Sequence, residues 1–378
     1  MKIRRVKAKI IKNSLGKDTI EVTVNRKYKG SVPLGVSVGK NEAKPFPYYG
    51  VPFDFVNKTL HKGFKGYMIQ DFHELEEVER ILSDKDGFEK IGGNTILAFE
   101  YALLRAMSGN EVWKFLNPSC DEMPIPIGCC VGGGKHYLGE SVDFQEVLVI
   151  PHGENFHDNV LVNSWIHKKI DNDHNPVERS FTQGWILNMD NVKTLEYVRK
   201  LIDEAFDKFD VHVGLGLDFA ASHNFNGDSY FYRKGKLSRE SQIRYVNSLI
   251  NTFSLEYVED PVHEDDVDGF GMIKGDVICG DDFVYGNLER LKEVAGKINC
   301  VCIKPTQAGS LIKVKNLIDW AKENNIEVVM SHRSGETDDS MIADLSAAWK
   351  TQYIKTGIVG KFNTPKIKRL KEIEKSIL

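Results

Sequence analysis

The sequence predicts an α/β protein in which a small α+β unit precedes a closed (β/α) barrel. Beyond residue 120, six apolar runs each end at a polar residue, and the last four steps between those residues are 22, 23, 28 and 23 residues long, enough for one strand and one helix. Catalytic residues of such barrels gather at the carboxyl ends of the strands, so this regularity favours a barrel over an open sheet. The six residues are Asp218, Glu259, Asp281, Lys304, His332 and Lys355.

The first 118 residues have a different texture. Residues 19–25 alternate, with Ile20, Val22 and Val24 on one face, which predicts a half-buried strand. An apolar helix, TILAFEYALLRAM, is expected to open at Asn94 and to close at Gly109. The stretch LNPSCDEMPIP carries three prolines and no period. We therefore expect an N-terminal capping domain over residues 1–120 and a catalytic barrel over 121–378.

Within the barrel region, strand-like runs alternate with amphipathic helices. Residues 191–209 place Leu195, Val198 and Ile202 on one helical face. This alternation predicts a parallel sheet. The longer first step of 41 residues, from Asp218 to Glu259, leaves room for a hairpin insertion around GDSYFYRKGK.

Composition excludes several classes of protein. The chain has 378 residues with 50 Lys plus Arg against 54 Asp plus Glu, a net charge of -4 that argues against nucleic-acid binding. No apolar run reaches the ~18 residues of a membrane span, and the basic start is followed by no apolar block, so neither a membrane anchor nor a signal peptide is expected. Six cysteines without C-x-x-C or zinc spacing favour buried thiols in the cytoplasm, and no zinc site is expected.

Three carboxylates end neighbouring predicted strands. Asp218, Glu259 and Asp281 would converge on one mouth of the barrel, where a hard divalent cation would relieve their repulsion. Because no His or Cys is among them, Mg²⁺ is favoured over zinc. Each carboxylate taken singly could instead cap a helix or pair with a surface lysine.

Cationic residues end the next strands. Lys304 and Lys355, with Arg333, would form an electropositive pocket for an anionic substrate, in which the pKa of a lysine falls from ~10.4 toward a value suited to proton abstraction. A lysine base beside a divalent metal suits removal of a proton next to a carboxylate. Arg333 and Ser334 follow the seventh strand, where barrels often bind phosphate. Either lysine alone could equally be a solvated surface residue.

Several stretches resemble the enolase family. The runs SHRSGETDDSMIADL at 331–345 and QYIKTG at 352–357 are the most specific, and SLEYVEDPVHEDD, CIKPTQAGSL, GLGLDFAAS and GGNTILAFEYALLRA follow the family's order over nearly the whole chain. The resemblance implies a (β/α)8 barrel of enolase type behind an N-terminal α+β domain. It also implies a lyase that interconverts 2-phosphoglycerate and phosphoenolpyruvate in glycolysis and gluconeogenesis.

The resemblance further implies roles for individual residues. Lys304 would be the base, and two Mg²⁺ would bind, the second arriving with a small phosphorylated carboxylate substrate. The implied residues are Asp218, Glu259 and Asp281 for the first Mg²⁺; Ser37 for the second; Glu146 and Thr182 at the acid side; and His136, Gln145, His332, Arg333, Ser334 and Lys355 for substrate. A homo-oligomer, dimer or higher, without nucleic-acid or membrane partners is expected.

One loop departs from the family pattern. The family's Gly-Asp-Glu-Gly-Gly-Phe loop carries a glutamate that helps to expel the hydroxyl, whereas SFTQGW here puts Thr182 at that position and Gln183 after it. Neither donates a proton as a carboxylic acid does, a role worth ~10²- to 10⁴-fold in rate. Glu178, His174 or Glu146 could substitute. Two alternatives therefore stay open: an enolase paralogue acting on another carboxylate, and a non-catalytic metal-binding scaffold.

Overall fold

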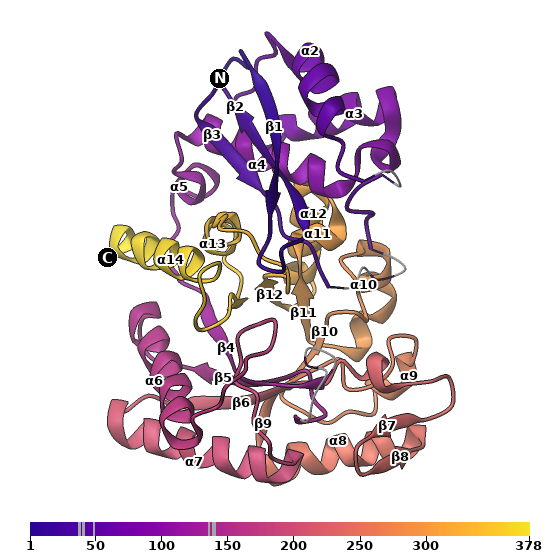
Figure 1. Ribbon diagram of the computed structural model, residues 1–378, viewed down its shortest axis with the longest axis vertical. Coiled ribbons are helices and arrows are strands. Elements are labelled where there is room, and N and C mark those ends of the chain that lie inside the picture. The colour runs from indigo at the N-terminus through magenta and orange to yellow at the C-terminus, as the bar shows by residue number, and fades with distance from the viewer. Residues whose placement is uncertain (37–38, 40–41, 48–49, 135–136, 138–140) are drawn as a thin grey trace.

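The computed structural model describes residues 1–36, 39, 42–47, 50–134, 137 and 141–378. A three-stranded sheet with its helices lies at one end of the molecule, and an eight-stranded closed barrel forms the rest (Figure 1). The fold expected from the sequence, an eight-stranded barrel behind a small α+β unit, is confirmed.

The N-terminal sheet is an antiparallel meander that rests on one buried helix. β1 (Val6–Lys12), β2 (Asp18–Val24) and β3 (Tyr28–Ser31) pair in sequence order. α4 (Gly93–Ser108) packs so closely on β3 that a Cβ at Gly30 would lie 2.3 Å from the carbonyl oxygen of Ala98. The remaining helices here are α1 (Phe53–Phe55), α2 (His61–Phe64), α3 (Glu74–Ile91) and α5 (Val112–Leu116), with a π-helical turn at Val56–Leu60.

The ends of α4 agree with the sequence at one terminus only. Gly109 ends the helix in the left-handed conformation at φ 67°, as a C-terminal glycine usually does. The N-cap is Gly92, at φ 84°, and Asn94 lies inside the first turn, where its side chain donates to the carbonyl of Pro33. The predicted Asn94 cap is therefore wrong, because that amide is used to hold the chain that follows β3.

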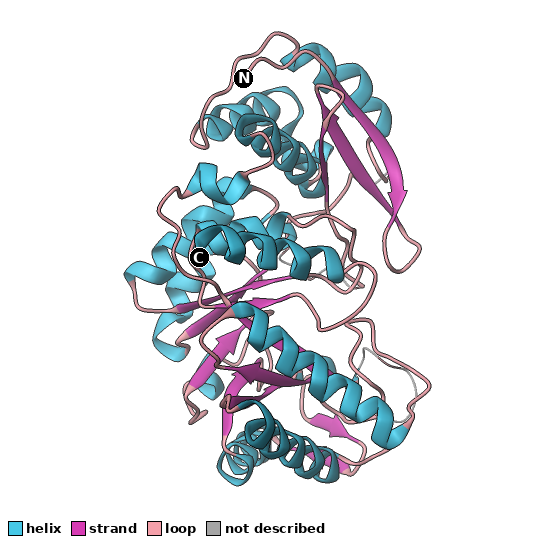
Figure 2. Cartoon of the chain, turned by 90° about the vertical axis from the view of Figure 1, so that its left-hand side faces the viewer, coloured by secondary structure: helices cyan, strands magenta, loops and turns pink. Residues whose placement is uncertain are grey.

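The barrel closes in the order β10-β11-β12-β13-β4-β5-β6-β9. Helices surround it (Figure 2). One strand, β5, runs antiparallel to both neighbours. The prediction of a parallel sheet is therefore wrong for this strand. The segment between β4 and β5 contains no described helix, and parallel strands need a crossover of a dozen or more residues, usually helical. The barrel strands are β4 (Ile125–Gly132), β5 (Glu146–Pro151), β6 (Val213–Asp218), β9 (Leu255–Glu259), β10 (Val277–Gly280), β11 (Cys300–Ile303), β12 (Glu327–Ser331) and β13 (Tyr353–Lys355).

The expected helix over 191–209 and the expected hairpin insertion are both present. β7 (Tyr230–Tyr232) and β8 (Gly235–Leu237) form the hairpin between β6 and α8. The helices of this part are α6 (Phe156–His174), α7 (Asn191–Phe209), α8 (Arg239–Phe253), α9 (Val267–Phe270), α10 (Leu288–Val294), α11 (Pro305–Ala308), α12 (Leu311–Glu323), α13 (Met341–Ala348) and α14 (Thr364–Ile377), with 3₁₀ turns at Ala221–Asn224 and Ala295–Lys297.

Buried side chains from the strands fill the barrel interior between its two mouths. They include Leu148 and Ile150 of β5, Tyr257 of β9 and four of the six cysteines. All six cysteines are buried and unbridged, as expected. Within the described part of the chain, no helix combines the length and apolar character that a membrane crossing requires.

Polar contacts join the N-terminal unit to the barrel. Arg105 of α4 donates to both carboxylate oxygens of Asp339 at 2.7 and 2.6 Å, and Asp339 also accepts the backbone N–H of Ser31. The backbone N–H of Leu34 donates to the carbonyl of Gly335 at 2.8 Å. These bonds lay the segment after β3 across the barrel mouth.

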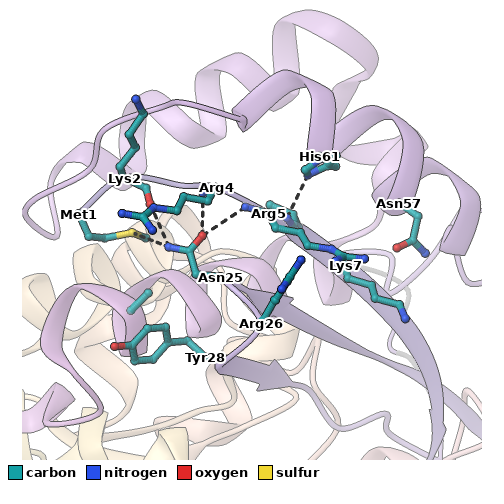
Figure 3. Close-up of a pocket in the computed structure, with 12 residues that line it drawn as sticks. Met1, Lys2, Arg4, Arg5, Lys7, Asn25, Arg26, Tyr28, Asn57 and His61 are labelled. Atoms are coloured by element: carbon teal, nitrogen blue, oxygen red, sulfur yellow. Dashed lines mark hydrogen bonds between the residues drawn. The ribbon is translucent and has the colours of Figure 1, made fainter.

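A basic hollow of about 860 Å³ lies in the N-terminal unit, away from the barrel. Figure 3 shows its cationic side chains, contributed by the chain start and by the β2–β3 turn. Among the described residues no carboxylate lies within 4.0 Å of any of these cations, so they are uncompensated at short range. The cationic residues are Lys2, Arg4, Arg5, Lys7 and Arg26.

Candidate active site

The barrel mouth holds a cavity of about 430 Å³ in which most of the predicted site residues meet. Glu259 is absent from its lining but accepts a hydrogen bond from Lys355, which lines it. The predicted residues Ser37 and His136 lie outside the described residues. The predicted residues that line the cavity are Gln145, Glu146, Thr182, Asp218, Asp281, Lys304, His332, Arg333, Ser334 and Lys355.

Lys355 ends β13 in the middle of three carboxylates. Its Nζ lies 3.0 Å from Glu146, 3.0 Å from Glu259 and 3.5 Å from Asp218. Burial by itself lowers the pKa of Lys355, but these three anions raise it overall. The side chain is thus a fixed cation, held at 7% exposure at the centre of the acidic cluster.

The acidic residues beside Lys355 are short of positive charge. Burial raises the pKa of Asp218, and the neighbouring Glu259 raises it further despite Lys355. The pKa of Glu259 is raised as well, chiefly by burial, although Tyr257 donates to its carboxylate. A cation brought to these oxygens would offset both effects.

Lys304 contacts Asp281 directly. Burial lowers the pKa of Lys304, but the charge of Asp281 outweighs it, and the pKa is raised overall. The expectation that this pocket depresses the lysine pKa is therefore wrong for the chain by itself. The raised pKa of Lys304 comes chiefly from the ion pair with Asp281, with smaller contributions from Cys302 and Asp282, whereas burial and the nearby Arg333 lower it.

The carboxylates fit a hard divalent cation. Oxygens of Glu259 and Asp281 lie within 4.8 Å of one another, together with the thiol of Cys302. Burial raises the pKa of that thiol, so the protonated sulfur is a poor ligand and oxygen donors remain. Asp218 stands outside this group and accepts a hydrogen bond from the Gln145 amide at 3.1 Å. Of the three predicted ligands, Asp218 and Asp281 thus line the cavity, Glu259 neighbours Asp281 without lining it, and the three form no closed cage.

Sequence reasoning missed two acids next to the predicted ligands. Asp260 and Asp282 form a second group with Asp281 whose oxygens lie within 4.8 Å of one another. Asp260 accepts the backbone N–H groups of both Asp281 and Asp282, at 3.0 and 2.8 Å, and so fixes the end of β10. Burial and the charge of Asp281 raise the pKa of Asp282 to about 7. The acidic doublets in the sequence, 259–260 and 281–282, were the available signal.

Arg333 is already paired with a carboxylate. Its Nη1 lies 2.7 Å from Glu42 and 3.2 Å from the Thr306 hydroxyl, and both partners of the ion pair are under 10% exposed. Ser334 accepts the backbone N–H of Val36 through its hydroxyl at 3.0 Å. An anion that uses this arginine fork must therefore compete with Glu42, which the sequence did not predict.

Two polar atoms at the cavity lack hydrogen-bond partners among the described residues, namely Nδ1 of His332 and Oε1 of Gln145. Burial lowers the pKa of His332 to about 3, so its imidazole is neutral at ordinary pH. Unpaired buried polar atoms are costly, and both are free to bind a ligand. The cavity therefore offers one neutral donor or acceptor and one acceptor besides its charged groups.

The loop that departs from the family pattern carries Thr182 into the cavity. Its hydroxyl contacts the Cys129 sulfur at 3.6 Å and the Ser180 hydroxyl at 3.2 Å. Gln183 stands at φ 74°, a left-handed conformation that favours glycine. Of the suggested substitutes for the acid, Glu146 lines the cavity, whereas Glu178 and His174 are absent from its lining.

Comparisons with known proteins point to one family. Residues 121–377 match the family model described as "Enolase, C-terminal TIM barrel domain". A curated protein named enolase from Archaeoglobus fulgidus is 33% identical, over 99% of this chain and 97% of its own length. Enolases from Methanothermobacter thermautotrophicus and Methanosphaera stadtmanae are 33% and 34% identical, over 99% and 100% of this chain and 97% of their own lengths.

Proposed function

Because the chain belongs to the enolase family, whose members imply a lyase with a divalent metal, we propose that it is a Mg²⁺-dependent hydro-lyase that interconverts 2-phosphoglycerate and phosphoenolpyruvate. The observation that carries the proposal is the convergence of Lys304, Lys355 and Arg333 with the buried carboxylates on one 430 Å³ cavity. Such a cavity is suited to a small, multiply charged anion.

The first step is removal of a proton next to the substrate carboxylate. Asp218, Glu259 and Asp281 would hold Mg²⁺, which when bound supplies charge neutralisation to the developing carbanion. Lys304 is the base in this proposal. If Asp281 were a metal ligand, its ion pair with Lys304 would weaken. The pKa of Lys304 would then fall, which favours the neutral amine that proton abstraction requires.

Other residues would bind and orient the substrate. Lys355, a permanent cation, would meet the substrate carboxylate, and Arg333 with Ser334 would bind the phosphate after Glu42 is displaced. The neutral His332 could donate or accept one hydrogen bond without adding charge. Ser37 for a second Mg²⁺ and His136 for substrate remain part of the proposal from resemblance alone.

A second candidate is proton abstraction from a different carboxylate substrate. It is favoured by Thr182, which lines the cavity and which the resemblance aligns with the family's glutamate. Glu146 is the nearby carboxylate, and it already pairs with Lys355 at 3.0 Å. Under this candidate the base and the metal ligands work, but no group supplies the proton for departure of a hydroxyl.

A spectrophotometric assay tests the proposal. Phosphoenolpyruvate should appear from 2-phosphoglycerate when Mg²⁺ is present, and solvent deuterium should exchange at C2. Lys304→Ala should abolish both, whereas Lys292→Ala, an exposed lysine paired with Glu289, should abolish neither. Exchange without turnover favours the second candidate. Unchanged exchange in Lys304→Ala refutes Lys304 as the base, and the absence of both signals in a Mg²⁺-binding wild-type protein favours a non-catalytic scaffold.

We also propose a cytoplasmic homo-oligomer. Six buried, unbridged cysteines suit a reducing compartment. Light scattering of the purified protein gives the mass of the assembly directly. A monomeric mass would contradict the oligomer.

A further inference from the structure

Two histidines stand side by side at the barrel mouth opposite the active site. His152 directly follows β5 and His212 directly precedes β6, and these strands pair antiparallel with Pro151 opposite Val213. The backbone N–H of His152 donates to the carbonyl of His212 at 2.8 Å. Their ring centroids lie 5.6 Å apart.

A glutamate from a third strand completes the group. Glu256 of β9 places its Oε1 2.7 Å from Nε2 of His152. Gly214 of β6 makes this possible, because a Cβ there would lie 2.0 Å from the other oxygen of Glu256. One ligand atom each of His152, His212 and Glu256 lies within 4.8 Å of the other two.

The alternation along β5 directs His152 to the barrel axis. Along β5, the inward side chains are Glu146 at the active-site mouth and then Leu148 and Ile150 in the interior. The next residue in this alternation is His152. A further acid is near, since the charge of Glu256 adds to the burial that raises the pKa of Glu327 on β12. The opposite mouth of the barrel is therefore polar and acidic.

We propose that His152, His212 and Glu256 bind one divalent transition-metal ion, with Zn²⁺ as the expected ion. Two imidazoles and one carboxylate are a frequent zinc donor set, with water as the fourth ligand. Zinc–ligand bonds of ~2.0–2.1 Å put tetrahedral ligand atoms ~3.3 Å apart, so small side-chain rotations suffice. Side-chain exposures of 27% for His152 and 20% for Glu256 leave access for the ion and water.

This site differs in chemistry from the active site. The active-site donors are carboxylate oxygens, which suit Mg²⁺, whereas imidazole nitrogen favours zinc and its neighbours. The two ends of the barrel would thus take different metals. Sequence spacing could not indicate this site, because its ligands lie on or next to three different strands and share no local spacing. An ordinary His152–Glu256 ion pair with no metal is the competing explanation.

Zinc titration of chelator-treated, full-length protein tests the site, with excess Mg²⁺ present to occupy the active-site carboxylates. We expect one tight Zn²⁺ equivalent by calorimetry. His212→Gln should weaken it by ~100-fold or more, beyond the ~10- to 100-fold typical of losing an outer-shell partner. His73→Gln, another exposed histidine, is the matched control and should bind as the wild type does.

Two further measurements keep the outcome decisive. Zn²⁺ should raise the melting temperature of the wild-type protein but not that of His212→Gln, and Co²⁺ should give the visible absorption of a tetrahedral complex only with the wild type. His212 is exposed, so its replacement leaves the core intact. Zinc affinity equal in His212→Gln and wild type, or no zinc binding by the wild type in Mg²⁺, overturns the proposal and leaves the proposed lyase function untouched.

Discussion

Replacing Glu42 by Gln should tighten binding of phosphate at Arg333. In the structure Arg333 donates to Glu42 at 2.7 Å within a pair that is almost fully buried. A phosphate group must break that bond before it can use the guanidinium. A hydrogen bond to a charged group contributes ~1.5–3 kcal/mol. Removing the competitor should therefore improve phosphate affinity by ~10- to 100-fold, at ~1.4 kcal/mol for each factor of ten.

The same substitution should destabilise the phosphate-free protein. Breaking a buried ion pair typically costs ~3–5 kcal/mol because one charge is left without its partner, although the Thr306 hydroxyl still accepts from Arg333 at 3.2 Å. Added phosphate should restore part of this stability. The variant should thus melt earlier than the wild type in phosphate-free buffer and show the larger stabilisation by phosphate.

Calorimetric titration with inorganic phosphate and thermal melts measure both effects. Glu264→Gln is the matched control, because Glu264 lies close enough for its pKa to respond to Glu42, yet no described hydrogen bond joins it to Arg333. Equal or weaker phosphate binding in Glu42→Gln, with the control unchanged, would refute the idea that Glu42 competes for the phosphate position.

Four other outcomes are expected. Thr182→Glu should raise the rate of phosphoenolpyruvate formation by up to ~10²- to 10⁴-fold, the general contribution of a positioned acid, and no gain in the spectrophotometric assay would contradict the alignment of this loop. Gln183→Gly, at φ 74°, should stabilise the fold by ~1 kcal/mol in urea unfolding, and a loss of stability would show that the side chain outweighs the strain. Arg26→Gly should also stabilise the fold, because Asn25 and Arg26 (φ 52° and 63°) form a tight turn that prefers Asn-Gly. The substitution also removes one of the neighbouring cations that Figure 3 shows. An Arg26→Lys control should not be more stable than the wild type. Folding raises the pKa of Asp282 from 3.8 to about 7, so the stabilisation from its protonated form is fully present below pH 3.8 and is lost as pH rises through about 7. Metal-free protein should therefore be less stable to urea at pH 8 than at pH 6. An Asp282→Asn variant should lose much of that difference.

The periodic part of the fold was predictable because strands and helices leave residue-level patterns. The regular spacing of polar strand ends gave the barrel, and the alternation in 19–25 gave β2. The reversed direction of β5 was not predictable in this way, since an inward-facing strand has the same two-residue period in either direction. Direction depends on the connection, and the loop after β4 carries no such pattern.

The residues that line the site could be predicted from the sequence, but their ion pairs and ionisation states could not. Strand-end positions and the family resemblance together named the lining of the cavity. They could not show that Lys304 contacts Asp281 or that Arg333 contacts Glu42, because ionisation depends on which neighbours lie within a few ångströms. The histidine pair at the far mouth was missed for a related reason, as its members meet only through strand pairing.

The inverted strand β5 has a mechanical consequence. Its first residue, Glu146, reaches the lysine at one opening of the barrel, and the residue after its last, His152, reaches Glu256 at the other. The six residue steps of ~3.3 Å between these two residues span ~20 Å. Backbone hydrogen bonds to β4 on one side and β6 on the other hold this strand in place. Any sliding of it along its own length would have to disturb both openings together, so anchoring one end also steadies the other.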